Sequence, residues 1–142
     1  VLFIRMALNA LDGMLAREFQ QPTPLGAMLN ELGDVLADAA LYLPLLLIPG
    51  VSATLVIALV WLALLSEFCG VAAVQIGASR RYDGPMGKSD RALLLGGIAV
   101  ALGCGAPAGF WLTALLFAAN GLLILTCYNR VRAALREMTP CL

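Results

Sequence analysis

The stretch SATLVIALVWLALLSEFCGVAAVQIGA, residues 52–78, contains one charged side chain, Glu67. At ~1.5 Å rise per residue, a helix needs about 20 apolar residues to cross the ~30 Å hydrocarbon core of a bilayer. This stretch is therefore long enough and apolar enough to span a membrane. Glu67 then lies inside the bilayer, where an ionisable side chain needs a partner or a function.

The rest of the chain has the same character. It has 142 residues, of which 61% are hydrophobic and 13% are charged, and its mean hydropathy is +0.91. A water-soluble domain of this size does not need so much apolar surface for its core. The composition predicts an all-α, polytopic transmembrane helix bundle, and the length allows roughly five or six spans. We expect residues 1–142 to form a single transmembrane domain.

Breaks in the apolar pattern divide this domain into helices. REFQQPTPLG, Pro49-Gly50 and CGAPAG contain the prolines and glycines that end helices. Together with the first stretch they predict five helices, at residues 1–17, 25–48, 52–78, 92–103 and 110–128. The chain opens on Val1 and has no basic segment typical of a signal peptide. We therefore expect it to be truncated before or inside a first helix.

The distribution of charge predicts a topology and excludes several functions. Arg17, the basic residues of the 80–91 loop and those of the tail after residue 128 fall on one side of the predicted helices, which the positive-inside rule makes cytoplasmic. Formal net charge is zero and no basic tract occurs, which argues against nucleic acid as a partner. The chain has no histidine, and its four cysteines lack C-x2-C spacing. Acid–base chemistry must therefore fall to carboxylates.

Those carboxylates gather in NALDGMLAREFQQPTPLGAMLNELGDVLADAA, residues 9–40. Residues three or four apart share one face of a helix. One face of the first predicted helix and one of the second carry the polar and glycine positions, which are Arg5, Asn9, Asp12 and Gly13, and Gly26, Asn30, Asp34 and Asp38. A carboxylate facing hydrocarbon costs ~2.5 kcal/mol or more, so these side chains should face each other or a water-filled cavity.

Such a cluster needs positive charge at its centre. Divalent ions with oxygen ligands supply it, and two ions ~3.5–4 Å apart can clamp a pyrophosphate. Gly13 and Gly26 would let a ligand or backbone approach closely. The alternative is that these polar residues only join helices through hydrogen bonds.

The spacing resembles the signature of the CDP-alcohol phosphatidyltransferase family, D-x2-D-G-x2-A-R-x8-9-G-x3-D-x3-D. Asp12-Gly13, Ala16-Arg17, an eight-residue gap, Gly26 and Asp34 match this pattern. Asn9 and Asn30 stand where the family has aspartates. Each substitution keeps an oxygen ligand but removes a charge, which should weaken metal binding. Asp38, or alternatively Glu31, can supply the missing carboxylate.

This resemblance implies six transmembrane helices, five of them present here, with the site open to the cytoplasmic half of an inner or cell membrane. It implies two divalent ions, Mg2+ or Mn2+, that hold the pyrophosphate of a CDP-diacylglycerol-like lipid. Metal ligands would come from Asn9, Asp12, Asn30, Asp34 and Asp38. Asp34 would also act as general base on the acceptor alcohol, with Asp38 as the alternative base. Family members are often dimers, so a homodimer is one expected assembly.

Basic residues near this motif are candidates for substrate binding. Arg5 lies on the face of Asn9 and Asp12, and Arg17 belongs to the signature. Lys88 and Arg91 follow Gly87 at the start of a predicted helix, where they can bind a phosphate of the acceptor or anionic lipid headgroups, or serve only as positive-inside charges. For Glu67, a pairing with Arg5, a role in the site and a helix-to-helix contact all remain open.

Two functions follow from this sequence. The first is a phosphatidyltransferase that joins a CDP-activated lipid to an acceptor alcohol and releases CMP. The second is a catalytically weakened relative that acts as a lipid-binding or scaffold protein, because Asn9 and Asn30 remove two charges from the expected site.

Overall fold

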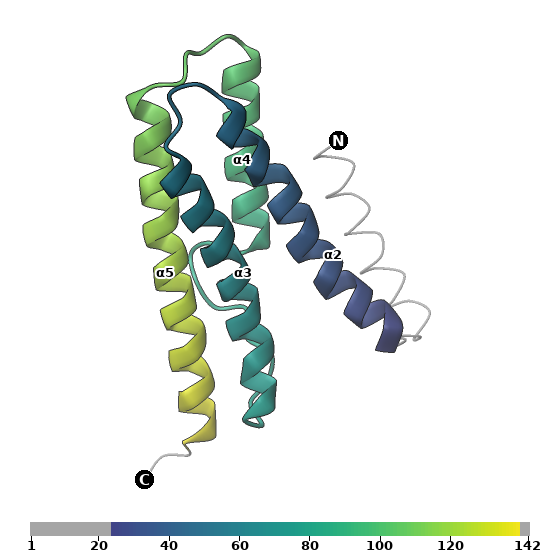
Figure 1. Cartoon of the computed structure of the whole chain (residues 1–142). Coiled ribbons are helices and arrows are strands. Elements are labelled where there is room, and N and C mark those ends of the chain that lie inside the picture. Colours follow the sequence, from purple (N-terminus) through teal and green to yellow (C-terminus); the bar gives the residue numbers. More distant parts are fainter. Residues whose placement is uncertain (1–23, 140–142) are drawn as a thin grey trace. The chain divides into compact units, whose positions relative to one another are not determined.

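The computed structural model describes the backbone of residues 24–139, and the side chains of all of these except residues 24, 25, 27, 29 and 30 (Figure 1). The chain divides into two compact units, residues 1–36 and 37–142. The helix expected over residues 1–17 lies outside the described residues. So do five of the predicted site residues, Arg5, Asn9, Asp12, Gly13 and Arg17.

All regular secondary structure in residues 24–139 is helical. Helix α2 (Pro24–Tyr42) begins in the first unit and ends in the second. The second unit continues with the 3-10 helix η1 (Leu43–Leu47) and the α-helices α3 (Ala53–Gln75), α4 (Lys88–Gly103) and α5 (Phe110–Met138). Helices α3 and α5 are long and apolar enough to cross a membrane. These helices confirm the predicted all-α class.

Three helix ends differ from the predicted ones by four residues or more. The helix expected over 25–48 stops at Tyr42, because Pro44 enters the next turn and cannot donate a backbone hydrogen bond. Helix α4 begins at Lys88 rather than at residue 92, because the Asp90 carboxylate accepts a hydrogen bond from the Gly87 N–H at 2.8 Å and caps the first turn. Helix α5 continues to Met138 instead of ending at residue 128. Its last turns are rich in Arg, Ala and Leu, which are strong helix formers.

The second unit is built around the packing of α3 against α5. The buried positions of both helices recur at intervals of three and four residues, the spacing of helices that pack nearly parallel through one continuous seam. On α3 they are Val56, Leu59, Ala63, Ser66, Gly70 and Ala73, and on α5 they include Leu112, Leu116, Ala119, Leu123, Thr126, Arg130 and Ala134. Small residues in this seam let the two backbones approach closely, as in membrane helix pairs.

Large apolar side chains also cover the outer faces of these helices. Trp61 and Phe68 on α3 and Phe117 on α5 are each about 70% exposed. Helices that are apolar all round are typical of proteins surrounded by lipid.

Two glycines allow the loop between α3 and α4 to pack closely against its neighbours. A Cβ atom at Gly70 would lie 2.6 Å from the Arg81 carbonyl oxygen, and one at Gly84 would lie 2.6 Å from Cγ2 of Thr126. Gly84 also has a φ of +130°, which favours glycine. The Met86 N–H then donates to Oγ1 of Thr126 at 3.0 Å. The loop thereby holds the start of α4 against α3 and α5.

Candidate functional site

The predicted acidic face on the second helix lies on α2. The polar and glycine positions of this face recur every four residues along the helix, at Gly26, Asn30, Asp34 and Asp38. They therefore lie on one side of the helix and rotate gradually around its axis. Gly26 is exposed, whereas Asp34 and Glu31 are half-buried. Asp38, at the start of the second unit, is buried, with 9% of its surface exposed.

Asp38 is held by Arg91 of α4. The Arg91 Nε and Nη2 atoms both lie 2.9 Å from Oδ2 of Asp38. Nη2 also lies 2.9 Å from Oε1 of Glu67 on α3, and Nη1 donates to Oγ of Ser66 at 3.3 Å. Arg91 is 1% exposed. A guanidinium so deeply buried is stable only with this kind of paired and hydrogen-bonded surroundings.

Glu67 extends this ion-pair cluster to two more arginines. Its Oε2 atom lies 3.5 Å from Nη1 of Arg130 and 3.7 Å from Nη2 of Arg80. Arg130, 2% exposed, also donates to the carbonyl oxygens of Ser66 and of Asp83, the latter at 3.3 Å. Of the alternatives for Glu67, the described residues therefore show helix-to-helix ion pairs with α4 and α5. Its predicted pairing with Arg5 lies outside the described residues.

We name these residues the buried ion-pair cluster: Asp38, Glu67, Arg80, Arg91 and Arg130. Three cations face two carboxylates. The cluster ties together α2, α3, α4, α5 and the loop before α4, and it fixes the orientation of the Asp38 carboxylate. Tyr42 adds to this arrangement, since its hydroxyl donates to the Arg91 carbonyl oxygen at 3.2 Å.

Of the predicted site residues, the structure brings Asp38 and Arg91 into direct contact. Lys88 is the first residue of α4 and is half-buried, one turn before Arg91. Asn30 is placed on α2 by its backbone alone. Among the described residues, no group of three or more carboxylate, thiol or imidazole side chains can hold a metal ion. The predicted ligands Asn9 and Asp12 lie outside that part of the chain, so the predicted metal site stays a prediction.

The sequence reasoning missed Ser66 and Arg130. Both occupy positions of the α3–α5 seam, Ser66 between Ala63 and Gly70 and Arg130 between Thr126 and Ala134. The three-and-four spacing of small and apolar residues would have found Arg130 if the last helix had been extended past residue 128. Its charge instead assigned it to the basic tail on the cytoplasmic side.

The described residues thus form a helical bundle with paired charged side chains in its interior and two helices apolar enough to cross a membrane. Residues 1–125 match the family described as CDP-alcohol phosphatidyltransferase. The chain belongs to this family, as the spacing in residues 9–34 predicted. The family carries out phosphatidyl transfer in phospholipid synthesis and generally uses divalent metal ions.

A curated relative supports the membrane assignment. The chain is 54% identical over 138 residues to "Inner membrane protein YnbA" of Escherichia coli (strain K12). The aligned region covers 95% of this chain and 67% of the relative. Together with the apolar helices α3 and α5, this relative identifies the chain as a membrane protein. No solved structure matches the chain.

Proposed function

We propose that this protein transfers a phosphatidyl group from a CDP-diacylglycerol-like lipid to an acceptor alcohol at the cytoplasmic side of the membrane. The observation that carries the proposal is the signature of residues 9–34 in a chain of this family. The proposal treats residues 1–142 as one catalytic transmembrane domain. Its cytoplasmic side is the side of the 79–91 loop and of the basic end of α5, in keeping with the positive-inside rule.

The chemistry is an in-line displacement at phosphorus. The acceptor hydroxyl gives its proton to the Asp34 carboxylate while its oxygen bonds to the phosphorus that carries the lipid. The bond from this phosphorus to the bridging oxygen of the pyrophosphate breaks, and CMP leaves with the bonding electron pair. Positioning the two reactants and neutralising charge supply most of the rate enhancement in such reactions.

The donor set of residues 9–34 fits a hard divalent cation. Carboxylate and amide oxygens are the ligands that Mg2+ and Mn2+ prefer. Asp12 and Asp34 would hold the ions, with Asn9 and Asn30 as neutral oxygen ligands. Bound ions would neutralise the pyrophosphate of the CDP-lipid. Arg5 and Arg17 would bind phosphate oxygens, with Gly13 and Gly26 leaving room for the nucleotide.

The contact between Asp38 and Arg91 indicates that these two residues position the site. Asp34 and Lys88 are the candidates for contact with the substrates. The Oδ2 atom of Asp38 already contacts two guanidinium nitrogens of Arg91, so it is less accessible to a substrate hydroxyl or a metal ion. We therefore assign the base to Asp34 and treat Asp38 and Arg91 as positioning residues. Lys88, half-buried at the start of α4, stays a candidate for binding a phosphate of the acceptor.

Release of CMP tests this proposal directly. The full chain, purified in micelles, is incubated with CDP-diacylglycerol, Mn2+ and a panel of alcohols that includes serine, inositol, glycerol phosphate and choline. We expect metal-dependent CMP release with at least one acceptor, and a loss of ~100-fold or more in Asp34→Asn, as for removal of a general base. Asp90→Asn is the matched control, because Asp90 is an exposed carboxylate that caps α4. Absence of metal-dependent release with every acceptor contradicts the proposal.

A second candidate is a weakened family member that binds lipid without turnover. The observation that favours it is Asn9 and Asn30 at two aspartate positions of the signature. This protein would bind CDP-diacylglycerol but release no CMP. Equilibrium binding of the CDP-lipid to the same preparation separates the two candidates, since tight binding without turnover supports the second alone.

A further inference from the structure

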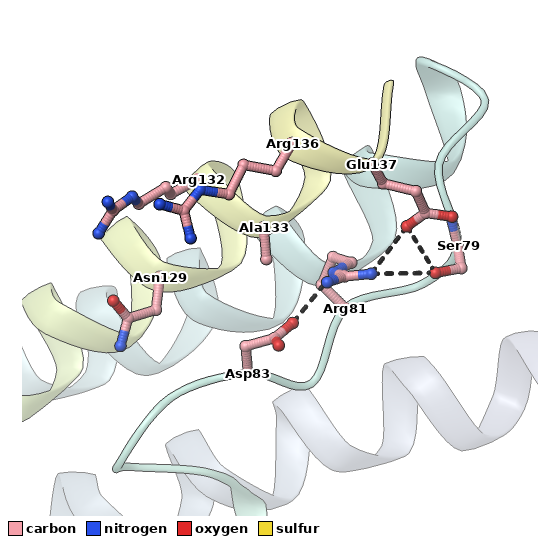
Figure 2. A pocket seen from close by; sticks show the side chains of 8 residues that line it. All are labelled: Ser79, Arg81, Asp83, Asn129, Arg132, Ala133, Arg136 and Glu137. Atoms are coloured by element: carbon pink, nitrogen blue, oxygen red, sulfur yellow. Dashed lines mark hydrogen bonds and ion pairs between the residues drawn. The ribbon is translucent and has the colours of Figure 1, made fainter. Parts of the chain in front are cut away.

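The charged end of α5 carries a polar groove outside the buried ion-pair cluster. Figure 2 shows this groove, which has a volume of about 790 Å³ and lies between α5 and the loop that follows α3. Its lining consists of Ser79, Arg81, Asp83, Asn129, Arg132, Ala133, Arg136 and Glu137. Three arginines and two carboxylates therefore share one open surface.

Both carboxylates of this groove are already bound to Arg81. The Arg81 Nη1 atom lies 2.7 Å from Oε2 of Glu137, and its Nε atom lies 3.0 Å from Oδ2 of Asp83. The N–H and hydroxyl of Ser79 also donate to Glu137, at 3.0 and 2.8 Å. These hydrogen bonds and the charge of Arg81 lower the pKa of Glu137, which lies beyond the apolar part of α5. Glu137 is therefore ionised at neutral pH and is committed to Arg81.

Two further arginines, Arg132 and Arg136, line this groove. Both are exposed, and neither forms an ion pair within residues 24–139. They lie four residues apart on α5, and in Figure 2 both side chains extend away from Ser79 and Glu137. Two neighbouring guanidinium groups without carboxylate partners are typical of a site for phosphate.

The same two arginines border a second groove, which is apolar. This groove, of about 660 Å³, is lined by Tyr128, Val131, Arg132, Leu135, Arg136 and Thr139. Tyr128, Val131 and Leu135 are each about half exposed. One ligand that touches both grooves must therefore have an anionic group next to a hydrocarbon segment.

The position of these grooves along α5 agrees with such a ligand. The 29 residues of α5 rise ~43 Å, more than the ~30 Å of a hydrocarbon core. Tyr128 follows the apolar part of the helix, and tyrosine favours the interface between lipid and water. The basic residues after it then lie at the depth of the lipid headgroups.

We propose that Arg132 and Arg136 bind the headgroup phosphate of an anionic phospholipid whose acyl chain lies against Tyr128, Val131 and Leu135. This lipid is a bound neighbour of α5 and not the CDP-lipid that the transfer reaction consumes. The site uses none of the residues assigned to catalysis, so the proposal stands whether or not the chain has transferase activity.

Native mass spectrometry of the full chain in detergent tests the site with phosphatidylglycerol and phosphatidylcholine as probes. We expect the wild-type protein to retain phosphatidylglycerol in preference to phosphatidylcholine. The double variant R132Q/R136Q should bind phosphatidylglycerol roughly 30-fold more weakly, the effect expected of two cations near a membrane surface. Equal binding by the wild type and this variant would overturn the proposal.

Two controls separate a lipid from free phosphate and from general loss of charge. V131S/L135S removes the apolar contacts and should also weaken binding of phosphatidylglycerol, whereas R132K/R136K keeps the charge and should retain most of it. If V131S/L135S binds as the wild type does and millimolar inorganic phosphate displaces the lipid, the ligand is a free phosphate and the lipid proposal is wrong. All four replaced side chains are exposed, and thermal unfolding in phosphatidylcholine checks that each variant is folded.

Discussion

Asp34 and Asp38 lie one turn apart on α2, and their surroundings give them different tasks. Asp38 neutralises Arg91, which is almost completely buried, while Asp34 occupies the last aspartate of the family signature. Removing one partner of a buried ion pair leaves a charge without compensation, at a cost of ~3–5 kcal/mol. Replacement of Asp38 should therefore lower the stability of the protein, whereas replacement of Asp34 should lower its activity.

We predict that Asp38→Asn destabilises the protein. Arg91 then keeps Glu67 as its remaining carboxylate, which Arg80 and Arg130 also share. The midpoint of thermal unfolding in micelles should fall well below that of the wild type. The double variant D38N/R91Q should recover part of the loss, because it removes both charges. A double variant less stable than Asp38→Asn would contradict this account.

At the scale of elements, α3 and the loop after it depend on close contact at Gly70. The Arg81 N–H donates to the Gly70 carbonyl oxygen at 3.2 Å, and Nη1 of Arg130 would lie 3.3 Å from an added Cβ. The backbone oxygen of Arg81, at 2.6 Å, cannot move without releasing the loop. We predict that Gly70→Ala costs about 1–3 kcal/mol in the free energy of unfolding, as overpacking of a tight contact does.

Gly96→Ala on α4 is the matched control for this change. Nothing lies within 4 Å of a Cβ at Gly96, so alanine there gains helix propensity without a clash. Chemical denaturation of both variants in mixed micelles gives the comparison. If Gly70→Ala unfolds like Gly96→Ala, then the loop is not held by contact at Gly70.

Hydropathy alone predicted the order of the helices in the second unit, but neither all of their ends nor their polar contacts. The apolar run of 52–78 corresponds to α3, and the breaks at Pro49-Gly50 and at residues 104–109 fall between helices as expected. Arg130 was assigned to the basic tail after the last predicted helix, whereas its place in the α3–α5 seam buries it beside Glu67. The partners of Glu67 could not be read from sequence, because Arg80, Arg91 and Arg130 are distant along the chain and only the tertiary packing selects them. The signature of residues 9–34 predicted the family, because the family is recognised by the spacing of these residues along the chain.

At the scale of the whole molecule, metal binding and stability should be linked, because a ligand that binds only the folded state raises its stability with concentration. We predict that Mn2+ raises the unfolding midpoint of the wild type and that N9D/N30D responds at about tenfold lower Mn2+, since two added carboxylates strengthen an oxygen site for a divalent ion. Asp12→Asn should abolish the response. This measurement needs no turnover, so it tests the metal site even if the chain is catalytically weakened. An N9D/N30D variant that needs as much Mn2+ as the wild type would show that positions 9 and 30 do not contribute ligands.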